Sequence, residues 1–162
     1  MFAQNPKVTD IFQRDLSSGL FRKSAAPRIL VADDDPITAR LLTTIGEREG
    51  YQVVSVNNGR DAYRMLKSNA DFAAAIFNMT MPNLGGADLI RHMKTEKRLM
   101  RIPVVIVAGD DGLKLIADTF AAGALAFLPK PFTTEKLAQI VRLVLSQTTR
   151  RKTNEGLGKV AA

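Results

Sequence analysis

Five short apolar runs alternate along residues 28–145 with stretches in which apolar side chains recur at helical spacing. The first run, RILVA at residues 28–32, has the continuous apolar character of a strand that is buried on both faces. Strands of this kind, when they are joined by helices, form a parallel sheet that helices cover on both sides. The sequence therefore predicts an α/β fold, a doubly wound (βα)5 domain with a five-stranded parallel sheet.

The strands of this fold are predicted at residues 28–32, 51–56, 72–78, 103–108 and 124–128. Pro36 can open the first helix, because proline is tolerated in a first turn, and Gly50 can end it. The middle helices are predicted around residues 62–66, at 87–97 and at 113–122. Either Thr133 or Thr134 can cap the last helix.

Composition places the chain among globular proteins, with 46% hydrophobic and 24% charged residues. It contains no Cys, which excludes both disulfide bonds and a thiolate metal site. The longest apolar runs, at residues 72–77 and 103–108, are far too short to span a bilayer, and the first residues lack the apolar core of a secretory signal. A cytoplasmic protein with no membrane span is predicted.

The net charge of +7 comes almost entirely from the two ends of the chain. Residues 1–28 carry five Lys/Arg against two Asp, and residues 146–162 carry four Lys/Arg against one Glu. We predict three parts: an N-terminal arm at 1–27, a domain at 28–148, and a basic, disordered tail at 149–162. The tail is too short for a helix-turn-helix output domain, so no specific DNA binding is expected.

The arm is longer than the predicted domain requires. Six of its apolar residues recur at helix-like spacing: Val8, Ile11, Phe12, Leu16, Leu20 and Phe21. The segment Ser17-Ser18-Gly19 interrupts this pattern. Two interpretations stay open, an amphipathic segment that docks on a partner, on a second copy or on the domain itself, and a disordered leader.

Three consecutive carboxylates, Asp33, Asp34 and Asp35, follow the first strand. Ligands of a doubly wound sheet bind at the carboxyl ends of its strands, so these acids are expected near Asn78 and Lys130, which end the third and fifth strands. Carboxylates that share a pocket stay ionised only beside a cation, either a divalent ion or a lysine. We therefore predict an acidic pocket, in which Asp35 also caps the following helix.

These features resemble the receiver domains of two-component response regulators over residues 28–148. The resemblance rests on RILVADDDP, on NMTMPNLGG in place of the family's D-x-x-M-P…G, and on the triplet Lys130-Pro131-Phe132, all at the family's spacing. It implies a flavodoxin-like (CheY-like) fold and a role in phosphorelay signal transduction. It also implies that the chain is not an enzyme and that it acts through protein–protein interaction.

In that family an acid pair helps to hold Mg²⁺, an Asp accepts a phosphoryl group from a histidine kinase, and a Thr or Ser and a Lys contact that group. The resemblance assigns the acid pair to Asp33 and Asp34, the metal-binding backbone carbonyl to Thr80, and the lysine to Lys130. The aromatic position that reports the switch is Phe127, which has no hydroxyl.

Two positions depart from the family's pattern: the phosphoacceptor position is Asn78, and the hydroxyl position is Ala108. An amide has no anionic oxygen to attack phosphorus, so no acyl phosphate can form there. The missing carboxylate also weakens Mg²⁺ binding, and Ala108 cannot donate a hydrogen bond to a phosphoryl oxygen. The sequence thus predicts a degenerate receiver, or pseudo-receiver, in which Lys130 pairs with Asp33 or Asp34 without metal.

Three alternatives stay open. An engineered Asp→Asn change in a normal receiver would explain Asn78 but not Ala108. Asp33-Asp34-Asp35 also satisfies the D-x-D of Mg²⁺-dependent haloacid-dehalogenase-like phosphatases, whose nucleophile is an Asp after the first strand. Finally, phosphorylation could be rerouted to Asp33 or Asp34, which lie beside the usual line of attack.

The expected interaction surface is the family's usual output face, formed by the fourth helix, fifth strand and fifth helix. It comprises parts of residues 114–122, 126–128 and 134–147. The expected partner is a histidine kinase or a downstream effector, and a second copy of the chain is a further candidate. Three remaining residues are given structural roles: His92 on the surface of the third helix, and Met79 and Met81 in packing beside the site.

Overall fold

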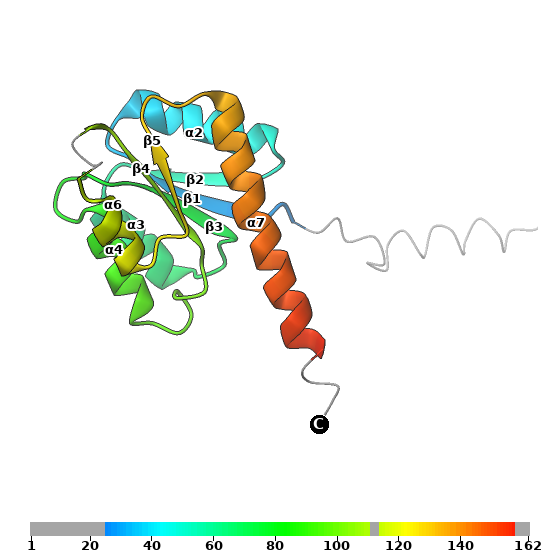
Figure 1. The fold of residues 1–162 in the computed structure, drawn as a ribbon. Helices are drawn as coiled ribbons and strands as arrows, with labels where there is room; N and C mark the ends of the chain where they lie inside the picture. Colours follow the sequence, from blue (N-terminus) through cyan, green and yellow to red (C-terminus); the bar gives the residue numbers. More distant parts are fainter. Residues whose placement is uncertain (1–24, 111–113, 158–162) are drawn as a thin grey trace, which may run out of the picture.

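The computed structural model describes residues 25–110 and 114–157 of the 162-residue chain. Its sheet has five parallel strands in the order β2-β1-β3-β4-β5 (Figure 1). The strands are β1 (Arg28–Ala32), β2 (Gln52–Val56), β3 (Ala74–Asn78), β4 (Val104–Ala108) and β5 (Ala126–Pro129). The helices are α2 (Pro36–Arg48), α3 (Gly59–Ser68), α4 (Gly86–Lys94), α6 (Ile116–Ala122) and α7 (Thr134–Leu157). The predicted doubly wound α/β fold is confirmed.

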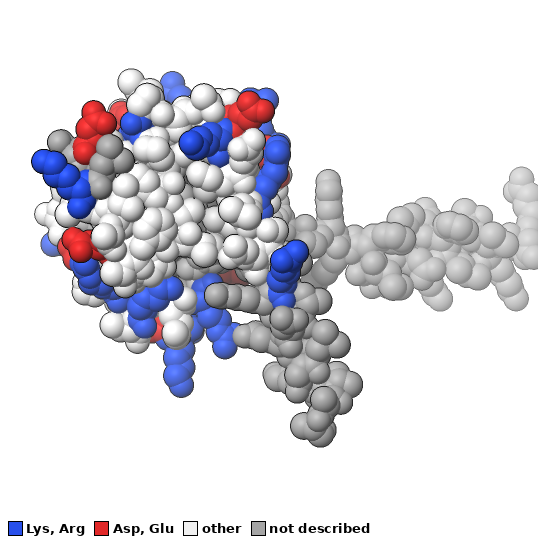
Figure 2. Space-filling model, viewed as in Figure 1, with Lys and Arg blue, Asp and Glu red and all other residues white. Residues whose placement is uncertain are grey.

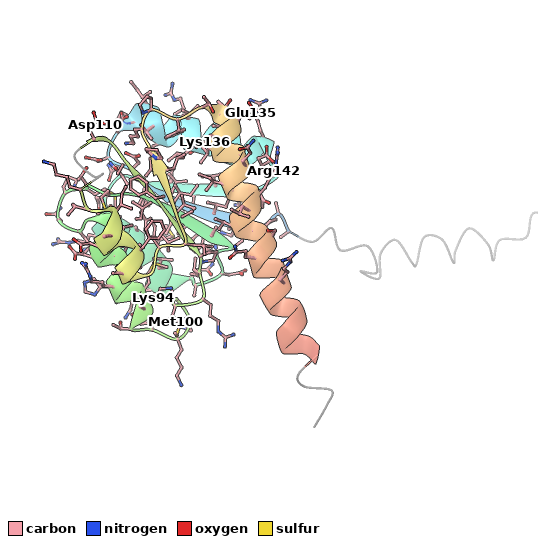
Figure 3. The ribbon with its side chains drawn as sticks, in the orientation of Figure 1. Lys94, Met100, Asp110, Glu135, Lys136 and Arg142 are labelled. Atoms are coloured by element: carbon pink, nitrogen blue, oxygen red, sulfur yellow. The ribbon has the colours of Figure 1, made fainter. Side chains whose placement is uncertain are left out.

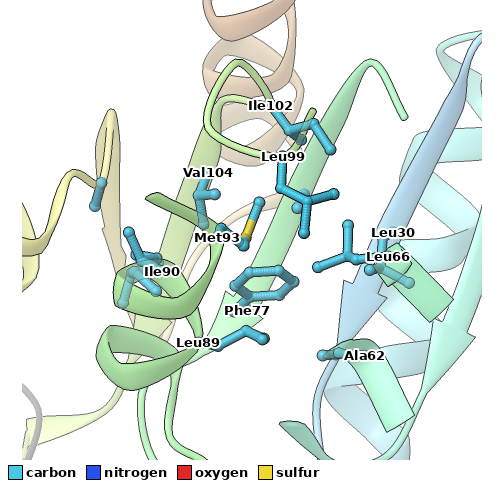
Figure 4. Packing of buried hydrophobic residues seen from close by; sticks show 14 of the residues in the cluster. Leu30, Ala62, Leu66, Phe77, Leu89, Ile90, Met93, Leu99, Ile102 and Val104 are labelled. Carbon is cyan, nitrogen blue, oxygen red and sulfur yellow. The ribbon is translucent and has the colours of Figure 1, made fainter. Parts of the chain in front are cut away.

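Helices cover both faces of the sheet, which explains the apolar character of its strands. Helices α2 and α7 pack on one face, and α3, α4 and α6 lie on the other (Figure 1). Every residue of β3 and β4 is buried. On the second face Phe77 of β3 packs in a cluster with Leu66 of α3 and with Leu89 and Met93 of α4 (Figure 4).

The helix ends follow local side-chain chemistry. Asp35 caps α2, because its carboxylate accepts the N–H of Ile37 at 3.1 Å and that of Thr38 at 3.3 Å, as predicted. Thr133 caps α7 by accepting the N–H of Lys136 at 3.2 Å. Gly123 ends α6 with φ 116°, a left-handed conformation that favours glycine.

The last helix is longer than the sequence suggested. Helix α7 continues to Leu157, past the predicted domain end at 148 and through residues 149–157. This stretch contains no proline and has several Arg, Lys and Thr residues, so the backbone can continue the helical hydrogen-bond pattern. The division into arm, domain and tail otherwise stays a prediction, since residues 1–24 and 158–162 lie outside the described residues.

The fifth strand begins later than predicted, at Ala126 rather than residue 124. The N–H of Ala124 bonds to the carbonyl of Thr119, and this bond closes the end of α6 before the strand begins. Among the helices that the structure describes, none combines the length and the apolar character that crossing a membrane would require.

Candidate functional site

The candidate site lies where the strands end. Asp33 follows β1, Asn78 is the last residue of β3, and Lys130 follows β5. Parallel pairing brings these ends to the same edge of the sheet, since Ala32 faces Phe77 across the β1–β3 pair. The structure thereby brings together the residues predicted for the acidic pocket: Asp33, Asp34, Asn78, Thr80 and Lys130.

The side-chain amide of Asn78 lies at the centre of this pocket. Its Nδ2 donates to Asp34 Oδ1 at 2.9 Å, to the carbonyl oxygen of Thr80 at 3.2 Å and to Asp33 Oδ1 at 3.3 Å. An amide oxygen in this position would face three acceptor oxygens without a hydrogen to donate. The amide nitrogen therefore points into the pocket and donates to them. Asn78 is 6% exposed, so the amide N–H groups, and not water or a cation, contact the oxygens of the pocket.

Asp33 is the buried carboxylate of the pocket, with 1% exposure. Its Oδ1 also accepts the backbone N–H of Asp35 at 2.9 Å, and its Oδ2 lies 3.4 Å from Lys130 Nζ. The lysine side chain keeps 25% of its surface exposed, so it reaches the carboxylate from the solvent side. Within the described residues, every buried side-chain nitrogen and oxygen has a hydrogen-bond partner.

Burial raises the pKa of Asp33 above its ordinary value, and the N–H of Asp35 and the charge of Lys130 offset this only in part. When the folded pKa exceeds the unfolded one, the protonated form is the one that favours folding. The associated stability is fully present below the unfolded pKa of about 3.9 and is lost as the pH rises through the folded pKa. At neutral pH the ionised Asp33 therefore lowers the free energy of unfolding.

An Asp33→Asn variant, uncharged at every pH, is expected to be more stable than the unmodified protein at about pH 7. Its advantage is expected to shrink as the pH falls to about 4, where Asp33 itself becomes protonated. Urea unfolding of both proteins at the two pH values measures this, and Asp71→Asn, at an exposed carboxylate, controls for the loss of one charge. A less stable Asp33→Asn variant at neutral pH would mean that the pair with Lys130 outweighs burial.

The metal position of receiver domains does not fit a divalent ion as the side chains stand. The oxygens that would hold the ion belong to Asp33, Asp34 and the Thr80 carbonyl, and all three already accept from Asn78 Nδ2. An amide nitrogen is a donor and cannot serve as a ligand for Mg²⁺, which prefers oxygen. No group of three or more His, Cys, Asp or Glu suited to a metal occurs elsewhere in the described part of the chain.

The two switch positions lie on β4 and β5. Ala108 is 1% exposed at the end of β4, where its carbonyl accepts the N–H of Lys130 at 2.8 Å and its side chain offers no hydroxyl to the pocket. Phe127 of β5 is half-buried and packs against the core cluster on the α3–α4–α6 face of the sheet.

Two contacts that position the site were not predicted. The fully buried Thr119 of α6 donates to Met79 Sδ at 3.4 Å, which joins this helix to the residue after Asn78. Gly59 is the first residue of α3 and lies against the backbone of Leu84 in the loop after β3. Both contacts join segments far apart in the sequence, so no local sequence pattern predicts them.

The residues given structural roles lie as predicted. Met79 and Met81 are buried beside the site, with 6% and 9% exposure. His92 is exposed on α4, with its ring 5.4 Å from that of Tyr63.

The phosphatase alternative gains no support from this geometry. Its nucleophile would be Asp33, but this carboxylate is buried and both of its oxygens are engaged. A nucleophile must be reachable by the substrate, and Asp33 is only 1% exposed.

Comparison with known proteins agrees with the fold. The family model described as the response regulator receiver domain matches residues 29–142. Chemotaxis protein CheY1 of Helicobacter pylori is 29% identical over 119 residues, which cover 73% of this chain and 96% of that protein. The receiver domain of a signal transduction histidine kinase from Syntrophus aciditrophicus is 33% identical, with a TM-score of 0.69, and covers 75% of this chain and 92% of that one.

One further similar structure contains a magnesium ion. The receiver domain of a sensor histidine kinase from Pseudomonas aeruginosa, with a magnesium ion coordinated in its active-site cleft, is 22% identical at a TM-score of 0.69. It covers 75% of this chain and 99% of that one. At this identity the likeness concerns the fold. The family match runs from β1 into α7 and includes Asp33, Asn78 and Lys130. The chain therefore belongs to the response regulator receiver domains, the signalling modules of two-component systems.

Proposed function

We propose that this chain is a degenerate receiver that signals through protein contacts and takes no phosphoryl group at the usual position. The observation that carries the proposal is the amide of Asn78, which stands where a receiver needs a carboxylate and donates to both neighbouring acids. An acyl phosphate requires an anionic oxygen as nucleophile, and the amide offers none.

In this proposal Asn78 and Lys130 together replace the cation of the acidic pocket. Asn78 supplies N–H groups to Asp33 and Asp34, and Lys130 supplies a positive charge to Asp33. A divalent ion could bind only after the amide turned away, so we expect weak Mg²⁺ binding at Asp33, Asp34 and the Thr80 carbonyl. The domain would then keep one conformation without metal.

Ala108 supports the same proposal independently of Asn78. A change made only to prevent phosphorylation of a normal receiver would leave the hydroxyl at the end of β4 in place, but the residue there is Ala108. Phe127 likewise has no hydroxyl to offer a new hydrogen-bond partner. We therefore propose that the domain lacks the phosphoryl-driven switch, and that it is not an ordinary receiver whose phosphorylation was blocked by an engineered Asp→Asn change.

The proposed contact surface is the face formed by α6, β5 and α7, which Figure 2 shows as a broad uncharged area. Three large apolar side chains are exposed there: Phe120 at 47%, Leu125 at 38% and Leu143 at 57%. Exposed apolar groups gathered on one face are typical of interaction sites. A histidine kinase or a downstream effector in the cytoplasm is the proposed partner, and a second copy is the alternative; no catalytic activity is proposed.

The direct test is the intact mass of the protein after incubation with Mg²⁺ and a small acyl phosphate. We expect no added phosphoryl group, because Asn78 has no anionic oxygen and Asp33 is buried away from the donor. An ordinary receiver domain treated alongside shows that the donor is active. An adduct that hydroxylamine removes, mapped to Asp33 or Asp34, would mean that phosphorylation is rerouted and would overturn the proposal.

A further inference from the structure

An apolar surface beside the acidic site has no covering element among the described residues. This surface, here called the Ile37 surface, is a shallow hollow of about 570 Å³ on the outer side of α2, lined by Pro36, Ile37, Arg40, Leu41 and Thr44. Ile37 is 78% exposed, more than any other large hydrophobic side chain that the structure describes. A contiguous apolar surface of this kind is typical of an interaction site.

The Ile37 surface continues toward the acidic site. Leu41 also lines a second hollow, of about 390 Å³, together with Phe132, Lys130 and Asp110. The two hollows therefore form one apolar surface with acidic groups at its site end, where Asp34 and Asp110 are exposed. Arg40 lies at the other side of the surface. A fitting occupant would be an apolar segment that carries mainly basic and some acidic side chains.

The first 24 residues of this chain have that chemistry. Val8, Ile11, Phe12 and Leu16, which precede the Ser17-Ser18-Gly19 interruption, would line one side of a helix over residues 8–16. The same 24 residues carry four Lys/Arg and two Asp. They thus combine an apolar stripe with a basic balance, and the two acids could approach Arg40.

The segment is also long enough to reach α2 and lie along it. Helix α2 runs from the acidic edge of the sheet back to the edge where β1 begins, and the segment enters β1 at that second edge (Figure 1). A helix over residues 8–16 would be about 14 Å long, which fits along α2, whose 13 residues span about 20 Å. The eight residues 17–24, if extended, can span about another 26 Å, which is enough to turn the segment onto α2.

We propose that the segment of residues 1–24 folds back and docks on the Ile37 surface, beside the acidic site, through an amphipathic helix over residues 8–16. The covering segment would compete with any protein that approaches the site from α2. The proposal does not depend on whether Asn78 prevents phosphorylation, because it rests on the exposed face of α2 and on the composition of the segment.

The absence of Cys allows a direct test in the full chain. A nitroxide label on a Ser17→Cys variant would weaken the NMR signals of nearby methyl groups. We expect the methyl signals of Ile37 and Leu41 to lose most of their intensity. The methyl of Met100, which is 46% exposed and lies at the opposite end of the molecule from Asp110 (Figure 3), should keep its intensity. Equal intensities at Ile37, Leu41 and Met100 would overturn the proposal.

Two controls identify the occupant. Mixing labelled chains that carry no NMR isotope with isotope-enriched chains that carry no label should cause no loss; a loss at Ile37 would mean that a second copy occupies the surface, which contradicts the proposal. In the labelled chain, Ile37→Ser should restore the signal of Leu41, whereas Met100→Ser, a change at another exposed apolar side chain, should not. If Leu41 stays weakened in Ile37→Ser, the segment docks elsewhere and the proposal fails.

Discussion

An Asn78→Asp variant is expected to lose about 3 kcal/mol of folding stability in metal-free solution and to regain most of it in Mg²⁺. The substitution removes an amide that donates to Asp33, Asp34 and the Thr80 carbonyl, and puts a third carboxylate in its place. Lys130 remains as the only cation that the described residues bring to the pocket, at 3.4 Å from Asp33. Three carboxylates beside one lysine leave an unbalanced negative charge in a buried position.

Mg²⁺ should correct this imbalance, because the variant offers carboxylate oxygens and a carbonyl where the unmodified protein offers an amide N–H. Binding that reaches about 100 times the dissociation constant would return about 2.7 kcal/mol. Urea unfolding with and without Mg²⁺ measures both effects. Asn78→Ala is the matched control, since it frees the same oxygens of Asp33, Asp34 and Thr80 but adds no carboxylate, so Mg²⁺ should rescue it less than it rescues Asn78→Asp.

The same variant should accept a phosphoryl group from an acyl phosphate, because the carboxylate introduced by Asn78→Asp would supply the missing nucleophile. Ala108 would still be present, so we expect the modification without the ordinary rearrangement of Phe127. If Asn78→Asp is as stable without Mg²⁺ as the unmodified protein, the amide does not neutralise the pocket in the way that we propose.

A Gly59→Ala variant is expected to be destabilised by at least about 3 kcal/mol, at the upper end of what overpacking costs. An added Cβ at Gly59 would lie 2.0 Å from the carbonyl oxygen of Leu84 and 2.8 Å from its Cβ. Neither atom belongs to a flexible side-chain end, so the backbone of α3 or of the loop after β3 must shift. Since this loop carries Thr80, the shift would also disturb the hydrogen bonds of Asn78.

Chemical denaturation and the amide signal of Asn78 measure the two consequences. Gly109→Ala is the matched control, because an added Cβ there meets nothing within 4 Å. Its free energy of unfolding should stay within about 0.5 kcal/mol of the unmodified value. Equal stabilities for the Gly59 and Gly109 variants would show that the loop after β3 adapts freely and does not constrain the site.

The strands at the centre of the sheet could be predicted from the sequence because burial on both faces leaves a continuous apolar run. RILVA is β1 to the residue, and the buried run ending in Asn78 is β3. The end of α7 could not be predicted in the same way. Its apolar face contacts the core at positions up to Leu145, and the sequence after that residue has no apolar run that would predict where the helix ends.

The composition of the candidate site could also be predicted, because parallel strands bring their last residues together. Asp33, Asn78 and Lys130 meet for this reason. The direction of the Asn78 amide could not be predicted, since it depends on oxygens that come from two different loops. Local sequence carries no information about such a meeting, nor about the contact between Thr119 and Met79.

The most direct test of the central claim is an amide NMR spectrum of the unmodified protein, recorded before and after addition of Mg²⁺ and then of a small acyl phosphate. Because Asn78 and Lys130 already neutralise the acidic pocket, we predict that the signals of both residues stay in place through both additions. A shift at Mg²⁺ concentrations that saturate an ordinary receiver domain would mean that the pocket still binds the ion tightly. A further change after the phosphodonor, extending to Phe127, would contradict the account, because phosphoryl switching would then survive through another acceptor.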